Sequence, residues 1–180
     1  MNDATLLAMS DKQFRQVVAE TLTIYRNGQI IELATSPLAC SSLIEHYLLD
    51  DEPRTADVLY KALQSILIWA VEKLRPIGDP DWLAPQWRNY NILHHFYIQG
   101  RSWGELSEQM YTSEQNISRW WRPHAVTAVA RILQDELNHP SHNNHLKQAM
   151  LEERYTHYAL DESYQFILHF LSIFRHPAPS

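Results

Sequence analysis

The sequence has few of the residues that β-sheet, disulfide-bonded and membrane proteins need. Four glycines in 180 residues leave little material for β-turns. The single cysteine, Cys40, excludes an internal disulfide framework and a cysteine-rich zinc site, and we expect it to be small and buried. The longest apolar run, residues 66–71 with their neighbours, is far shorter than the roughly 20 residues of a membrane span.

The sequence also begins without a basic segment followed by an apolar core, so we expect no secretory signal. We therefore predict a cytoplasmic protein with no membrane partner. Lysine is absent between Lys73 and Lys147, and the net charge is −6, whereas a free-standing nucleic-acid-binding protein is more often basic. The charge is unevenly distributed, because residues 88–131 carry five arginines against three glutamates.

The residues that are present favour helices. The composition, 45% hydrophobic and 20% charged, is that of a folded protein, and leucine, alanine, glutamate and glutamine are abundant. We predict an all-α fold in three parts: an N-terminal helical segment (residues 1–78), a central domain (82–138) and a C-terminal pair of helices (141–176).

The N-terminal segment is predicted to contain two long helices. Ser10 and Gln13 have the spacing of a capping box, which places one helix start at residue 11. Acidic residues and a proline at 51–53 indicate the start of the second. That helix carries an apolar stripe, which we interpret as a core face, with a dimer seam as the alternative. The stripe consists of Leu59, Leu63, Ile66, Ala70 and Leu74.

Histidines are spaced by three residues in the polar tract that follows the central domain. His139, His142 and His145 lie within residues 139–145. Two of them would share a helix face, but no acidic or cysteine ligand completes a set within the tract. We interpret the tract as a solvated linker and predict no metal site.

The most informative stretch is YIQGRSWGELSEQMYTSEQNISRWW, residues 97–121. Ser102 and Glu105 have the form of a capping box, which predicts a helix start after Gly100. Either Thr112 or Ser113 begins a further helix, and glutamine at 115 would complete a second capping box with Thr112. The stretch therefore predicts two short helices joined by a tight turn, the arrangement called a helix-turn-helix.

Residues 90–133 resemble the helix-turn-helix of sigma-factor region 4 and related bacterial transcription regulators. The resemblance covers about a quarter of the chain. Matching positions are Gly100, Ser102, Glu105, Leu106, Ser107, Met110, Ser113 and Ile117. In that family the residues at and after the second helix start face duplex DNA, and hydroxyls at helix starts contact phosphates. The nucleic-acid-binding residues that the resemblance implies are Ser102, Ser113, Glu114, Gln115, Asn116, Ser118, Arg119 and Arg122.

Three positions depart from the family pattern. Tyr111 stands where the family often has glycine, so it either avoids a positive φ or tolerates strain there. Gly104 lies inside the first helix, where it permits close packing against the neighbouring helix. Pro123 is expected to break or kink the helix that follows Arg122.

Two adjacent tryptophans cannot face the same side of the second helix. Trp121 lies four residues after Ile117, so we place both in the core and expect Trp120 to be more exposed. We interpret Trp120 as a contact to another helix of this chain or to a partner protein. Stacking on a base or sugar is the alternative.

We predict a DNA-binding protein, a bacterial transcription regulator that reads duplex DNA through the helix-turn-helix. The alternative is an interaction or assembly subunit of a larger complex, for example beside an NTPase or nuclease partner, or a homodimer. No glycine-rich phosphate loop and no set of nucleophile, base and orienting residue is recognisable in the sequence. We therefore predict neither catalytic residues nor a cofactor.

Overall fold

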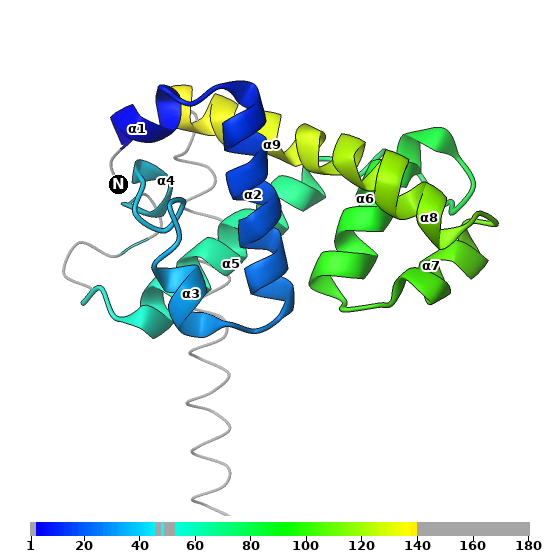
Figure 1. Ribbon diagram of the computed structural model, residues 1–180, viewed down its shortest axis with the longest axis horizontal. Helices are drawn as coiled ribbons and strands as arrows, with labels where there is room; N and C mark the ends of the chain where they lie inside the picture. The colour runs from blue at the N-terminus through cyan, green and yellow to red at the C-terminus, as the bar shows by residue number, and fades with distance from the viewer. Residues whose placement is uncertain (1–2, 46–47, 49–52, 140–180) are drawn as a thin grey trace, which may run out of the picture. The chain divides into compact units, whose positions relative to one another are not determined.

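A computed structural model describes residues 3–45, 48 and 53–139. These residues form helices joined by turns, and none of them lies in a β-strand, which confirms the all-α prediction (Figure 1). The chain divides into two units, 1–141 and 142–180, and all described residues belong to the first. The C-terminal pair of helices expected at 141–176 lies outside the described residues, as do His142 and His145.

The first half of the described chain contains two long helices and three short ones. They are α1 (Asp3–Leu7), α2 (Asp11–Arg26), α3 (Ile30–Ala34), α4 (Ser42–Glu45) and α5 (Ala56–Glu72). The capping box predicted before α2 is confirmed, because the Ser10 hydroxyl accepts from the Gln13 amide and the Gln13 side chain accepts from Ser10. The predicted start of α5 at 51–53 is wrong. Pro53 is not helical, and Thr55 caps the helix by accepting from the amide of Val58.

The second half contains three helical stretches. The first comprises the 3₁₀-helix η1 (Pro85–Trp87), α6 (Arg88–Asn91) and the π-helix η2 (Ile92–Ile98). The second is α7 (Trp103–Gln109). The third comprises α8 (Glu114–Asn116), the π-helix η3 (Ile117–Trp121) and α9 (Arg122–Asn138).

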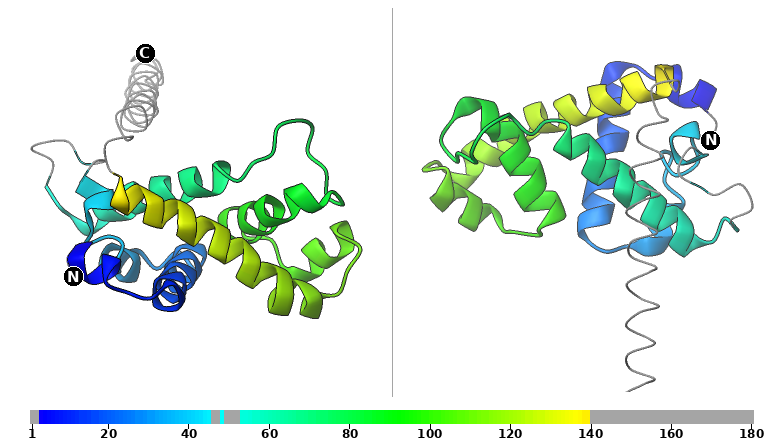
Figure 2. Two further views of the ribbon diagram at one scale, coloured as in Figure 1. Left: turned by 90° about the horizontal axis from the view of Figure 1, so that it is seen from above. Right: turned by 180° about the vertical axis from the view of Figure 1, so that it is seen from behind.

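Helix α9 connects the two halves. It packs on η3 and α6 at one end, on α2 and α5 along its length, and on α1 and α4 at the other end (Figures 1 and 2). The α5 stripe is covered by this core, since Leu63, Ile66 and Ala70 are fully buried within the chain, as its interpretation as a core face predicts. The proline-containing connector at 76–80 thus joins two segments that belong to one unit.

The expectation that Cys40 is buried is wrong. Its neighbours Leu38 and Ala39 are buried, at 0% and 5% exposure, whereas Cys40 points outward. Residues 37–40 form a turn rather than a regular helix, so no repeating face fixes which side chain points inward.

No described helix is both long and apolar enough to cross a membrane. The described residues also contain no group of three histidine, cysteine, aspartate or glutamate side chains that would hold a metal ion.

Candidate nucleic-acid interface

A complete capping box begins α7. The Ser102 hydroxyl accepts from the Glu105 amide at 3.2 Å, and Glu105 Oε2 accepts from the Ser102 amide at 2.7 Å. These hydrogen bonds stabilise the charged carboxylate, so they lower the pKa of Glu105, with Arg101 adding a smaller effect. The hydroxyl of Ser102 also donates to Glu105 at 2.8 Å, so the predicted phosphate donor is engaged within the chain.

The turn between α7 and α8 contains a strained residue. Tyr111 has φ 47°, and every other positive φ among the described residues belongs to a glycine. Tyrosine therefore tolerates a left-handed conformation that glycine adopts more readily, at a cost of about 1 kcal/mol. The Tyr111 side chain is 86% exposed, so packing of the ring does not explain the choice of residue.

Ser113, and not Thr112, caps the second helix. Its hydroxyl accepts from the Asn116 amide at 3.1 Å. The capping box expected between Thr112 and Gln115 is therefore wrong, because the residue three positions after the actual cap is Asn116. The Asn116 side chain instead donates to the Thr112 hydroxyl at 2.9 Å, so both hydroxyls of the turn take part in fixing the helix start.

The helix does not break at Pro123. The backbone remains helical from Ile117 to Arg122, and the Arg122 amide donates to the Ile117 carbonyl five residues earlier. This π-type bond shifts the hydrogen-bonding register just before proline, which lacks an N–H and lies in the first turn of α9. The π-helix thus accommodates Pro123 while α8, η3 and α9 remain one continuous helical stretch.

The predicted interface residues fall into two groups by exposure. The exposed group consists of Ser102, Ser113, Glu114, Gln115, Arg119 and Trp120. The half-buried group consists of Asn116, Ser118 and Arg122. Ile117 is fully buried beneath them, as predicted, whereas Trp121 is only half-buried, with the guanidinium of Arg88 4.1 Å from its ring centre.

Gln115 and Arg119 form a pair on the exposed face. With the amide oriented so that its oxygen faces the guanidinium, Gln115 accepts two hydrogen bonds from Arg119, at 2.9 and 3.1 Å. The two residues are four apart, which places them on the same side of the helix. Because an amide can hold a guanidinium without neutralising it, Arg119 keeps its positive charge at the surface.

Arg122 is held from the interior. Its Nε donates to the hydroxyl of Tyr97 at 2.6 Å, and Tyr97 is almost fully buried in η2. Arg122 therefore fixes the end of η3 against η2, and the residue is half-buried.

The geometry does not require glycine at position 104 for close helix packing, contrary to expectation. A Cβ at this position would lie 3.4 Å from Glu114 Oε1 and 3.8 Å from the Ser102 hydroxyl, which are ordinary contact distances. The nearest atom ends a flexible side chain, so an alanine would fit.

Three stacked side chains attach this region to α2. Phe96 lies parallel to Trp103, with ring centres 3.5 Å apart, and the guanidinium of Arg26 lies 3.8 Å from the Phe96 ring centre. Since both neighbours are within 4 Å, they occupy opposite faces of the Phe96 ring. Arg26 also donates to the carbonyls of Phe96 and Arg101, at 2.9 and 3.2 Å, near the end of η2. No local sequence pattern predicts this link.

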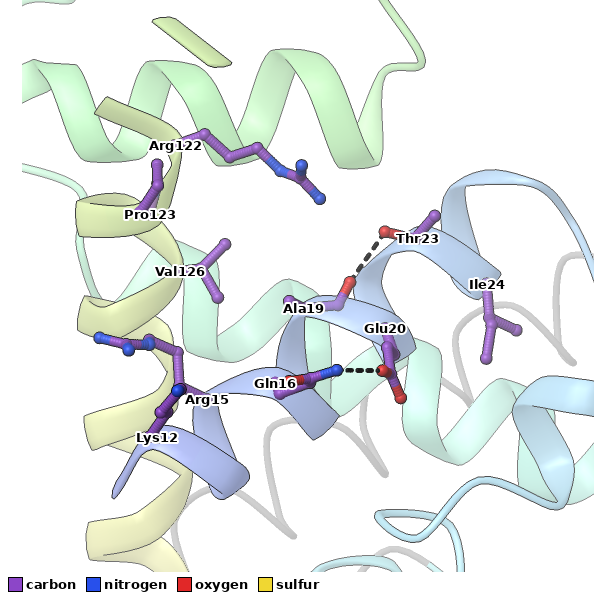
Figure 3. Close-up of a pocket in the computed structure, with 10 residues that line it drawn as sticks. All are labelled: Lys12, Arg15, Gln16, Ala19, Glu20, Thr23, Ile24, Arg122, Pro123 and Val126. Atoms are coloured by element: carbon purple, nitrogen blue, oxygen red, sulfur yellow. Dashed lines mark hydrogen bonds between the residues drawn. The ribbon is translucent and has the colours of Figure 1, made fainter. Parts of the chain in front are cut away.

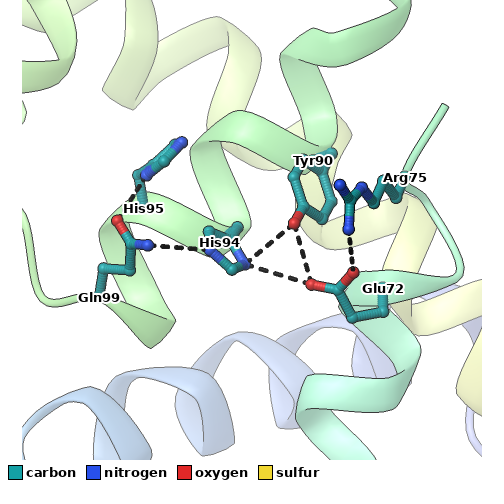
Figure 4. A network of polar contacts seen from close by, with 6 residues as sticks. All are labelled: Glu72, Arg75, Tyr90, His94, His95 and Gln99. Carbon is teal, nitrogen blue, oxygen red and sulfur yellow. Dashed lines mark hydrogen bonds and ion pairs between the residues drawn. The ribbon is translucent and has the colours of Figure 1, made fainter. Parts of the chain in front are cut away.

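A polar network attaches α6 and η2 to α5 (Figure 4). Glu72 accepts from the Tyr90 hydroxyl at 2.9 Å, and Nδ1 of His94 lies 3.3 Å from the same carboxylate oxygen. Burial, followed by the bond to Glu72, raises the pKa of Tyr90 to about 12.

The neighbouring His95 makes a separate set of contacts. It is half-buried, stacks on Trp82 and pairs with Gln99 at 2.7 Å, and burial lowers its pKa. The adjacent histidines therefore serve as structural contacts.

No protein-family model matches this chain, and no curated protein or solved structure matches it significantly.

Proposed function

We propose that residues 90–133 form a sigma-region-4-like helix-turn-helix that binds duplex DNA, and that the protein is a bacterial transcription regulator acting in the cytoplasm. In this proposal α7 is the supporting helix, residues 110–113 are the turn, and α8 with η3 is the helix that enters the major groove.

The observation that carries the proposal is the exposed Gln115–Arg119 pair on a capped, rigidly anchored helix. Arginine recognises guanine through two parallel hydrogen bonds, and glutamine recognises adenine in the same way. The two side chains are exposed together, and the helix that carries them is fixed by Ser113, by buried Ile117 and by the bond between Arg122 and Tyr97. Sequence-specific recognition of DNA needs base-contacting side chains that are held rigidly in this way.

Ser113 and the exposed backbone at the start of α8 are suited to a phosphate contact. Hydroxyls and amides at the start of a recognition helix set the position of the protein on the duplex without reading its sequence. Ser102 is exposed as well, but Glu105 occupies its hydroxyl and places a carboxylate beside it. We therefore assign phosphate contact to Ser113 ahead of Ser102.

A second function is favoured by Trp120, which is 65% exposed within the unit that the structure describes. A large exposed aromatic side chain beside an arginine is typical of the centre of a protein interface. The alternative is therefore an assembly subunit whose α8–η3 face binds a partner protein or a second copy of this chain.

Selection from a pool of random duplexes tests the proposal against this alternative. The proposal predicts that the full-length protein enriches duplexes with a common short sequence, and that a Gln115→Ala, Arg119→Ala variant enriches none. A protein-binding subunit would give no enrichment, while Trp120→Ala would lower its mass in light scattering.

A further inference from the structure

A groove of about 660 Å³ lies between α2 and the start of α9 (Figure 3). One wall is a single face of α2, on which the lining residues recur at helical spacing from Lys12 to Ile24. The other wall is formed by Arg122, Pro123 and Val126. The volume falls within the range of roughly 300–1,000 Å³ that small-molecule sites occupy.

The ends of the groove are positively charged. Figure 3 shows Arg122 at one end and Lys12 with Arg15 at the other. These three cations face a single lining carboxylate, Glu20, in a chain whose net charge is −6. The groove thus has the opposite sign to the protein as a whole.

None of the three cations forms an ion pair within the described part of the chain. Arg122 donates to the neutral hydroxyl of Tyr97, and Arg15 donates to the neutral hydroxyl of Thr127 at 3.4 Å. Glu20 is held by the Gln16 amide at 2.9 Å instead of by a cation. Positive charges gathered without a counter-ion repel one another, and a bound anion would relieve that repulsion.

The middle of the groove is apolar. Ala19 and Val126 face it from the two walls, and Pro123 lies beside Val126. A DNA backbone presents mainly charged phosphates and little apolar surface, whereas an organic anion with a hydrocarbon body covers the apolar middle and places its charge at the basic ends.

We propose that this groove binds an amphipathic organic anion, a molecule with an aromatic or aliphatic body and a carboxylate, sulfonate or phosphate group. The body covers the apolar middle of the groove, and the anionic group pairs with Lys12 and Arg15. Arg122 belongs both to the groove and to the predicted nucleic-acid interface, but Lys12 and Arg15 belong to the groove alone, so the proposal stands whether or not the protein binds DNA.

Two fluorescent probes that differ in one charged group test the proposal. 1-Anilinonaphthalene-8-sulfonate carries a sulfonate, and N-phenyl-1-naphthylamine has the same rings without it. We expect the protein to bind the sulfonate probe at least about tenfold more tightly, a difference of about 1.4 kcal/mol. Equal affinity for the two probes would overturn the proposal.

Charge removal locates the site. A Lys12→Gln, Arg15→Gln variant is expected to lose about tenfold in affinity for the sulfonate probe and to bind the neutral probe as before. The control, Lys61→Gln with Arg131→Gln, has the same net charge but changes exposed cations that do not line the groove, and it is expected to match the parent. Lys12→Gln alone changes an exposed side chain and should show a smaller loss in the same direction, even if the double variant folds poorly. Equal losses in the variant and the control would place the probe elsewhere.

Discussion

The Nε atom of Arg122 donates a 2.6 Å hydrogen bond to the hydroxyl of Tyr97, twenty-five residues earlier in the chain. Tyr97 is 1% exposed, so the bond connects Arg122 to a buried side chain. The bond links the end of the proposed recognition helix to the buried η2, and it explains why Arg122 is half-buried while Arg119 is exposed.

Tyr97→Phe removes this bond and leaves the ring packing in place. We expect a loss of about 1–2 kcal/mol in the free energy of unfolding, because the substitution leaves a partly buried guanidinium without its partner. Urea denaturation measures the loss. Tyr111→Phe is the matched control, since Tyr111 is exposed, and it should leave the free energy of unfolding unchanged. Equal effects of the two substitutions would show that the bond to Arg122 contributes nothing.

Arg26 is expected to be the most important connection between α2 and η2. Arg26→Ala removes two hydrogen bonds to carbonyls and the contact with the face of Phe96, and should destabilise the protein by about 2–3 kcal/mol. Arg26→Lys keeps the charge but lacks the planar guanidinium with its several N–H donors, so it should recover less than half of the lost stability. Full recovery by lysine would mean that charge alone matters. Urea denaturation of the two variants provides the measurement.

The positive φ of Tyr111 predicts an unusual stabilising substitution. Tyr111→Gly relieves the strain and should raise the free energy of unfolding by up to about 1 kcal/mol, after the greater flexibility of glycine in the unfolded chain is included. Gly100→Ala provides the opposite case, because Gly100 has φ 72° and alanine would be strained there. Thermal unfolding of both variants tests the pair. Destabilisation by Tyr111→Gly would show that the exposed ring contributes more than the strain costs.

The capping box of α7 predicts that the stability of the folded protein depends on pH. The pKa of Glu105 is lowered in the folded protein, so the folded state binds its proton less readily than the unfolded state does. The stability that this carboxylate contributes is therefore complete above its ordinary pKa near 4.5, and it is lost as pH falls from there through the lower folded-state pKa.

Carbon-13 NMR titration of the Glu105 carboxyl measures this pKa directly. Ser102→Ala removes the hydroxyl partner and should raise the pKa of Glu105 towards 4.5, whereas Ser107→Ala, on the same helix, should leave it unchanged. Acid unfolding supplies a second check, because Glu105→Gln should reduce the loss of stability below pH 4.5. An unshifted titration of Glu105 in the parent protein would contradict the capping account.

The sequence was most informative where the determining interactions are local. The capping boxes at Ser10 and Ser102 were predictable because both partners lie within four residues. Thr112 and Ser113 were ambiguous because two adjacent hydroxyls can each cap a helix. The structure shows that the Ser113 hydroxyl is the cap and that the Asn116 side chain donates to the Thr112 hydroxyl.

Contacts between residues far apart in the chain could not be predicted from the sequence. Arg26 and Phe96 are seventy residues apart, and no pattern near either residue pairs them. The prediction of a break at Pro123 is wrong for a different reason. A proline normally ends a helix, but here the Arg122 amide bonds to the Ile117 carbonyl five residues earlier, a π-type register that no local sequence pattern predicts. The groove beside α2 was missed because its cations come from segments more than a hundred residues apart.

The most direct test of the DNA-binding proposal is the affinity for duplex DNA over a series of salt concentrations, measured by fluorescence anisotropy. Arg119→Ala is compared with Arg131→Ala, an exposed arginine of α9 outside the proposed interface. We expect affinity that falls steeply with salt, a loss of about 1–3 kcal/mol for Arg119→Ala on the selected duplex, and little change for Arg131→Ala. No affinity for duplex DNA at low salt, or equal losses in the two variants, would contradict the proposal.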